Sequence, residues 1–222
     1  MDNKISCAGC SRVVCESGQY DKALDNCPIK TKSDLIQRQL EKYAQTGTRE
    51  FARQASIQEY ECYTRLPEGL TTIKPRILET VEFAAKMGYR KLGMAFCGGL
   101  RNEAKIINQI LESQGFEVVS VSCKIGGIPK ETIGIAREQK IGGPDVFEAM
   151  CNPITQAEIL NRENTDFNIM VGLCVGHDSL FLQHVKAPTT VLIVKDRVLG
   201  HNPAAALYLS GSYYKKLLHR KT

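Results

Sequence analysis

Four cysteines near the N-terminus are spaced like the ligands of a metal site. The first two are separated by two residues, a third follows after four more, and a fourth precedes a proline after another eleven. Short spacers place two sulfurs on one turn while a loop brings in the others, which suits a tetrahedral zinc ion or an iron–sulfur cluster. This spacing does not distinguish a zinc ion from an iron–sulfur cluster. The predicted ligands are Cys7, Cys10, Cys15 and Cys27.

A second set of four cysteines lies where predicted strands and helices meet. Three directly follow short apolar runs that read as strands, and one directly precedes an Asn-Pro helix start. Ligands bind outside the carboxyl ends of parallel strands, so these thiols are expected to converge at one sheet edge as a second metal site. The alternative is that each packs as a small buried side chain. The four are Cys97 after residues 91–96, Cys123 after 116–122, Cys174 after 167–173, and Cys151 before Asn152.

Two histidines and a glycine-flanked cysteine allow a different chemistry. His177 follows Cys174 by three residues, and His201 precedes an Asn-Pro helix start just as Cys151 does. The segment 172–176 reads G-x-C-x-G, the pattern of a nucleophile elbow. A cysteine hydrolase or acyl-transferase, with Cys174 as nucleophile and His177 and His201 as bases, is therefore an alternative function. The histidines could equally be metal ligands or hydrogen-bonded loop residues.

The residues after the first predicted strand could bind an anionic cofactor. Two glycines there let the backbone approach a negatively charged ligand at a helix N-terminus, and an arginine could pair with it. The pattern departs from the G-x-G-x-x-G spacing of a dinucleotide site. The candidate residues are Cys97, Gly98, Gly99 and Arg101.

The elements that must position these residues fall into three parts. Residues 1–30 have few large apolar side chains and need a metal or a neighbouring domain to order them. Residues 31–88 have apolar residues at helical spacing, and residues 89–222 alternate apolar strands with helices. Such alternation predicts a Rossmann-like α/β fold, a parallel sheet with flanking helices. We expect residues 1–30 to be a metal-binding module and 31–222 an α/β domain. Strands are expected at 91–96, 116–122, 167–173 and 189–194, and helices at 33–43, 49–63, 75–88, 100–114, 152–160 and 179–184.

Composition narrows the classes of protein that remain. The 222 residues are 43% hydrophobic and 24% charged with a net charge of +5, which excludes a disordered or fibrous chain. The basic residues are scattered except at the C-terminus, so no nucleic-acid partner is expected. No apolar run reaches the length needed to cross a bilayer and no signal-peptide core is visible, so we expect a cytoplasmic protein without a membrane partner.

Five motifs together resemble one cysteine-rich family, the domain of unknown function 1847. They are C-x2-C-x4-C, FCGGLRNEA, CNPI-x-QAEILN, GLCVGHDSLF and KDRVLGHNP-x-AALY, and they span nearly the whole chain. Members of this family are often labelled metal-binding proteins, with no reaction attached. The resemblance thus implies metal binding and touches Cys7, Cys10, Cys15, Cys27, Cys97, Cys151, Cys174, His177 and His201.

The sequence therefore predicts a metal-binding protein with an N-terminal four-cysteine site and a second cysteine site at the sheet edge. Zinc or an iron–sulfur cluster is the expected cofactor, and electron transfer with a redox partner or an unknown small molecule is the expected use. Beside the hydrolase alternative stands a third hypothesis, a thiol redox protein with a reversible disulfide among the sheet-edge cysteines.

Overall fold

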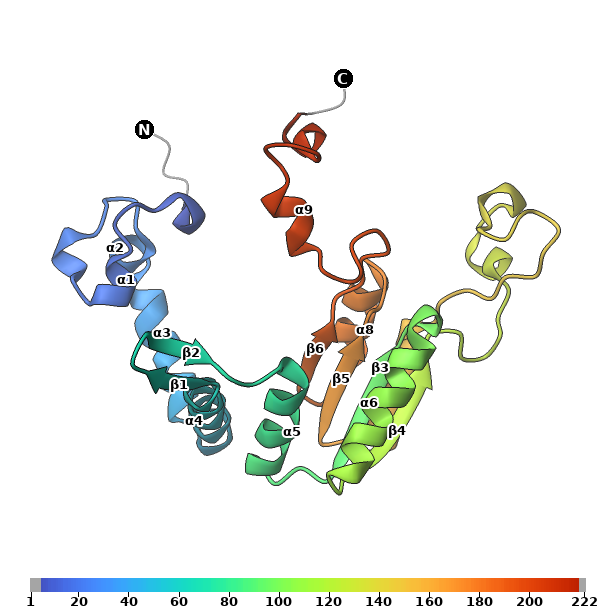
Figure 1. The fold of residues 1–222 in the computed structure, drawn as a ribbon, viewed down its shortest axis with the longest axis horizontal. Coiled ribbons are helices and arrows are strands. Elements are labelled where there is room, and N and C mark those ends of the chain that lie inside the picture. Colours follow the sequence, from blue (N-terminus) through green and yellow to red (C-terminus); the bar gives the residue numbers. More distant parts are fainter. Residues whose placement is uncertain (1–4, 220–222) are drawn as a thin grey trace. The chain divides into compact units, whose positions relative to one another are not determined.

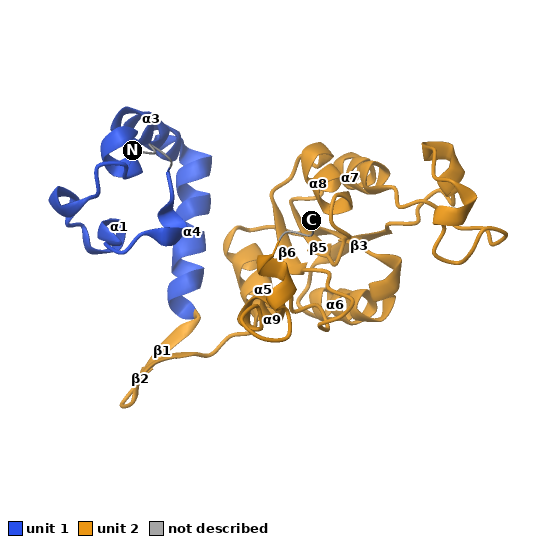
Figure 2. Cartoon of the chain, turned by 90° about the horizontal axis from the view of Figure 1, so that it is seen from above, with its two compact units in different colours: residues 1–61 blue, residues 62–222 orange. Residues whose placement is uncertain are grey.

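The computed structural model describes residues 5–219 and divides the chain into two compact units (Figures 1 and 2). Unit 1 comprises residues 1–61 and unit 2 comprises residues 62–222. The boundary falls at the end of a long helix, within the part of the sequence expected to be helical. The four N-terminal cysteines belong to unit 1, and the expected sheet belongs to unit 2.

Unit 1 is helical, and its two longer helices lie in the region after residue 30 where helices were predicted. Between residues 5 and 31 the helices are single turns, and two longer helices that follow pack against each other. Leu35, Leu40 and Tyr43 give the first of these its amphipathic pattern, yet all three side chains are exposed in the structure. The elements are the 3-10 turns η1 (Cys7–Gly9) and η2 (Tyr20–Lys22), and the helices α1 (Val14–Ser17), α2 (Pro28–Thr31), α3 (Ser33–Ala44) and α4 (Thr46–Glu61).

Unit 2 begins with a β-hairpin that the sequence did not suggest. Strands β1 (Tyr63–Leu66) and β2 (Gly69–Thr72) pair in antiparallel register. Pro67 and Glu68 form the turn between them, where a turn was expected. Helical spacing predicted that the preceding helix continues to residue 63, but it ends at Glu61.

A four-stranded parallel sheet forms the centre of unit 2 and confirms the predicted fold class. The spatial order is β4-β3-β5-β6, so β3 and β5 are the two inner strands. Every neighbouring pair is parallel, and Gly93 of β3 lies opposite Asn168 of β5. The strands are β3 (Lys91–Phe96), β4 (Glu117–Ser122), β5 (Phe167–Val171) and β6 (Thr189–Ile193).

Helices cover both faces of this sheet. Figure 2 shows α5 and α6 on one side and α7 and α8 on the other. Apolar side chains from the strands and helices, including Leu92, Leu111, Leu160 and Phe181, are fully buried between these layers. In the part of the chain that the structure describes, no helix is long and apolar enough to cross a membrane. The helices are α5 (Arg76–Lys86), α6 (Arg101–Ser113), α7 (Pro153–Arg162), α8 (His177–His184) and α9 (Ala204–Tyr208).

A long segment between β4 and α7 projects from the carboxyl edge of the sheet (Figure 1, yellow). An isolated bridge between Pro129 and Ala149 closes its neck. The Lys130 backbone N–H donates to Glu148 O, and the ammonium of Lys130 pairs with the Glu148 carboxylate at 2.6 Å. The segment contains 3-10 turns η4 (Lys130–Ile133) and η5 (Arg137–Gln139), and the turns η3 (Gly98–Leu100) and η6 (Lys215–Leu218) lie elsewhere in unit 2.

Candidate functional site

Three cysteines meet at the carboxyl edge of the sheet. Cys97 and Cys123 directly follow the neighbouring strands β3 and β4, and their backbone N–H groups extend the sheet hydrogen bonds. The backbone N–H of Asn152 donates to Cys123 O at 2.8 Å, which brings Cys151 beside Cys123. The sulfurs of Cys123 and Cys151 lie 3.8 Å apart. The expectation that these thiols converge at one sheet edge matches the geometry.

Cys97 is held as a thiolate. The ammonium of Lys195 donates to its sulfur at 2.8 Å. A hydrogen bond from Cys123, the Lys195 ammonium and the Gly99 backbone N–H lower the pKa of Cys97 to about 4, although burial acts in the opposite direction. Charge-assisted hydrogen bonds to the charged form are the general cause of such a shift.

Cys123 is the least acidic of the three thiols. Its position between Cys151 and Cys97, together with burial, raises the pKa of the Cys123 thiol, while the Gly98 N–H at 3.3 Å lowers it. The hydrogen bond from Cys123, with smaller contributions from Lys124 and His177, lowers the pKa of Cys151 to about 5, against the effect of burial. The set is therefore one thiol with a raised pKa beside two thiols with lowered pKa values. Because an S–H group has a single proton, Cys123 donates to only one of its two neighbours at a time.

Cys174 lies across the same edge, in the turn after β5. Its sulfur accepts a hydrogen bond from Arg197 Nη2 at 3.0 Å. His177 begins α8, and its Nδ1 atom is buried and has no hydrogen-bond partner within residues 5–219. Cys174 is not among the described non-glycine residues with positive φ, although Gly172 and Gly176 have φ of 60° and 86°. The turn thus lacks the strained nucleophile of an elbow, and the geometry does not favour the hydrolase alternative.

A cavity of about 480 Å³ joins these groups. The thiols of Cys97, Cys151 and Cys174 open into it, whereas Cys123 is buried behind them. Much of the remaining wall is basic, and its apolar part comes from the projecting segment. The basic residues that line the cavity are Lys124, Lys130, His177, Lys195 and Arg197.

Comparison with known proteins gives the family. The family model described as "Protein of unknown function (DUF1847)" matches residues 27–192. The chain belongs to the DUF1847 family. It is also similar to an uncharacterized protein of Methanocaldococcus jannaschii, with 44% identity over 217 residues that cover 98% of this chain and 100% of the relative. The resemblance seen in the motifs is confirmed, and neither similarity attaches a metal or a reaction to it.

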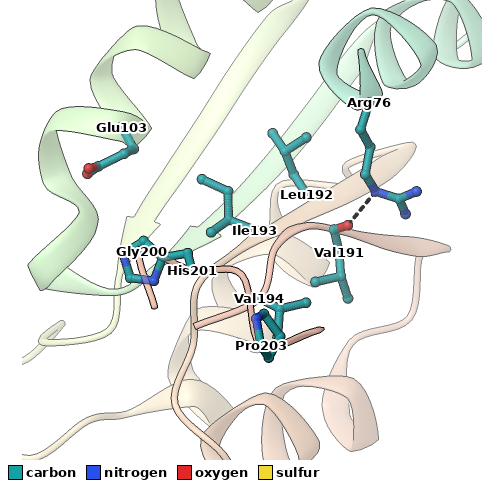
Figure 3. A pocket seen from close by; sticks show the side chains of 9 residues that line it. All are labelled: Arg76, Glu103, Val191, Leu192, Ile193, Val194, Gly200, His201 and Pro203. Carbon is teal, nitrogen blue, oxygen red and sulfur yellow. Dashed lines mark hydrogen bonds between the residues drawn. The ribbon is translucent and has the colours of Figure 1, made fainter. Parts of the chain in front are cut away.

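Two other predicted site residues of this DUF1847 chain lie away from the thiols. Figure 3 shows His201 next to Gly200 in a second cavity, which Glu103 of α6 and Pro203 also line. Arg101 lines a third cavity, between β3, β4 and α6. The structure therefore does not bring His201 or Arg101 to the cysteine cluster. Of the other predicted cofactor residues, Gly98 and Gly99 remain at the cluster through their backbone N–H groups.

Lys195 and Arg197 contact the sulfurs of this candidate site but were not predicted from the sequence. Both lie just beyond strand β6, at the same carboxyl edge as the cysteines. The argument that placed the cysteines therefore applies equally to the KDR segment after β6. Lys124 directly follows Cys123, so the same rule predicts that it too lies at this edge.

The four N-terminal cysteines lie in the single turns of unit 1. Cys7 and Cys15 are exposed, and Cys10 and Cys27 are half-buried. Among residues 5–219, no group of three or more His, Cys, Asp or Glu side chains is arranged to hold a metal ion. Metal binding at Cys7, Cys10, Cys15 and Cys27, and at the sheet edge, therefore stays a prediction.

One local feature nevertheless fits a thiophilic metal in unit 1. Backbone N–H groups of Val13 and Arg12 donate to the Cys10 sulfur and lower its pKa. Val13 has a φ of 44°, which is strained for a β-branched residue. The backbone thus bends so that two N–H groups stabilise one sulfur as a thiolate, the form in which cysteine binds a metal.

Proposed function

We propose that this protein is a thiol redox protein whose Cys123 and Cys151 form a reversible disulfide. The observation that carries the proposal is the 3.8 Å separation of these two sulfurs, of which that of Cys151 belongs to a residue lining the cavity and that of Cys123 is buried behind it. Thiol–disulfide exchange needs an accessible thiolate and a second thiol close behind it. Cys151 and Cys123 have these two properties.

The arrangement supports a defined sequence of steps. The Cys151 thiolate attacks one sulfur of a disulfide substrate, and the other half of the substrate leaves as a thiolate. Cys123 then loses its proton to solvent and attacks the Cys151 sulfur, which releases the second half of the substrate as a thiolate. Two protein thiol groups are oxidised to one disulfide while one substrate disulfide is reduced to two thiolates.

The test is to add bis(2-hydroxyethyl) disulfide to the reduced protein and map the products by mass spectrometry. We expect a Cys123–Cys151 disulfide in the native chain. Cys123→Ser should instead trap the mixed disulfide on Cys151, because the resolving thiol is missing. Cys62→Ser removes a buried thiol from another part of unit 2 and should leave the Cys123–Cys151 disulfide intact.

Two results would contradict this function. A mixed disulfide that persists on Cys151 in the native chain would show that Cys123 does not resolve it. Alternatively, stoichiometric metal that is released when Cys151 is alkylated would assign the sheet-edge cysteines to a metal site. Lys195 and Arg197 donate to the sulfurs of Cys97 and Cys174. Their positive charges would repel a divalent cation bound at the same sulfurs.

Metal binding by the N-terminal module is a second candidate function, favoured by the backbone geometry around Cys10. A bound metal would be held by Cys7, Cys10, Cys15 and Cys27, and its binding free energy would order the short turns of unit 1. Cys10→Ser is expected to remove the metal and lower the melting temperature of unit 1. Zinc, iron and acid-labile sulfide per chain, measured on protein purified without oxygen, check this. Cys62→Ser is the control, and a metal content that Cys10→Ser leaves unchanged would exclude the site.

A further inference from the structure

Three basic side chains around the thiol cavity lack a carboxylate partner. Lys124, Lys195 and Arg197 form no ion pair with Asp or Glu in the described chain; the hydrogen bonds of their side chains go to a backbone carbonyl and to two sulfurs. Glu148 is the one carboxylate among the described residues of the cavity wall, and it is paired with Lys130. Cationic side chains that converge on a cavity without partners create a positive potential that attracts anions.

The thiolates offset only part of this charge. Lys195 faces Cys97, and Lys124 lies close enough to Cys151 to stabilise its charge. Arg197 is the third cation, and its guanidinium donates to the Cys174 sulfur rather than to Cys97 or Cys151. A guanidinium offers a planar pair of donors that suits a carboxylate, sulfonate or phosphate group. Arg197 is therefore placed to hold an anionic group of a ligand whose other end reaches Cys151.

The rest of the cavity suits an organic ligand. Ile133, Ile135 and Ile141 from the projecting segment, together with Met150, form an apolar wall. A volume of about 480 Å³ lies in the usual range for small-molecule sites. A bare inorganic anion would leave this apolar surface and most of the volume unused.

We infer that the substrate of this cavity is a small organic disulfide that carries an anionic group, with Arg197 as the residue that selects the charge. This inference rests on the proposed thiol redox function and adds the chemical class of the substrate. The anionic group binds Arg197, the apolar chain lies along the isoleucine wall, and one substrate sulfur reaches Cys151. One such exchange releases the substrate as two thiolates and leaves the protein with the Cys123–Cys151 disulfide.

The test compares three alkyl disulfides of matched chemistry. They are 3,3′-dithiodipropionate, bis(2-hydroxyethyl) disulfide and cystamine, which carry negative, zero and positive charge. Each rate of protein oxidation is divided by the rate of the same disulfide with a free, uncharged thiol. We expect the anionic disulfide to be preferred over the cationic one by at least about tenfold at low ionic strength, with a smaller preference in high salt.

Arg197→Met is expected to reduce the ratio of anionic to neutral rates by about fivefold or more. The matched control is Lys105→Met, which removes the same charge from the wall of the third cavity and should leave the ratio unchanged. Equal normalised rates for the three disulfides, or a ratio that Arg197→Met does not alter, would overturn the inference.

A second measurement separates this inference from the proposed function. Alkylation of Cys151 by iodoacetate, relative to iodoacetamide, reports the charge preference even if no disulfide forms. Preference for iodoacetate that is lost in Arg197→Met supports the anion site by itself. Oxidation by the neutral disulfide without any charge preference would keep the redox function and reject the anionic substrate.

Discussion

Alkylation of Cys97 by iodoacetamide is expected to be almost independent of pH between pH 6 and 8. Only the thiolate reacts, and its hydrogen bonds with Cys123, Lys195 and the Gly99 N–H lower the pKa of Cys97 to about 4. The group is therefore ionised throughout this range, and its reactivity falls only as the pH approaches 4. An ordinary thiol with a pKa of about 8.5 would gain nearly a hundredfold in rate over the same range. Mass spectrometry of the peptide that contains Cys97 gives the rate at each pH.

Lys195→Met is expected to move this profile to higher pH. The substitution removes the ammonium that donates to the Cys97 sulfur at 2.8 Å. A hydrogen bond to a charged group contributes about 1.5–3 kcal/mol, so the midpoint should rise by about one to two pH units. Lys105→Met, in α6 at the third cavity, is the matched control and should leave the profile in place. A native profile that climbs tenfold per pH unit up to pH 8 would contradict the thiolate assignment.

The sheet was predictable because its strands are short apolar runs between turn signals. Residues 91–96 form β3 as expected, and the expected strand 116–122 differs from β4 by one residue. Parallel strands that are buried on both faces need a continuous run of apolar residues, so such a run is a strong indication of a strand. The hairpin of β1 and β2 was missed because its residues are half-exposed and follow a helix without an apolar boundary.

The thiol cluster followed from one rule, that parallel strands present their carboxyl ends at one edge. The rule brought Cys97 and Cys123 together correctly, but it could not show that His201 turns away. Asp196 Oδ1 accepts the N–H groups of Val198 and Leu199, and the Asp196 N–H donates to His201 Nδ1 at 3.1 Å. These local hydrogen bonds fold the loop so that the His201 ring enters another cavity. The order and direction of the strands do not predict such loop hydrogen bonds.

Gly93→Ala is expected to lower the free energy of unfolding strongly, because the new methyl group would overlap the buried core of the sheet. A Cβ atom at this position of β3 would lie 1.9 Å from Asn168 Oδ1 and 3.0 Å from Leu160 Cδ1. Asn168 is fully buried, and its Oδ1 accepts the hydroxyl of Thr165 at 2.8 Å, so the amide cannot move aside without losing that bond. Overpacking of this kind costs about 3 kcal/mol of unfolding free energy. Chemical denaturation of the native and variant chains measures the loss.

Two further variants tie the loss to this contact rather than to alanine in a strand. Gly211→Ala adds the same methyl group in unit 2 where nothing lies within 4 Å, and it should change stability by less than about 0.5 kcal/mol. Asn168→Ala, combined with Gly93→Ala, removes the atom that the new methyl group meets. Thr165 Oγ1 keeps Leu160 O as an acceptor at 3.2 Å in that variant. The double variant should therefore recover more than about 1 kcal/mol relative to additivity, because the two substitutions share one contact. Additive losses, or a Gly93→Ala chain as stable as the native one, would mean that the sheet adjusts at this position and that the packing around Asn168 is not tight.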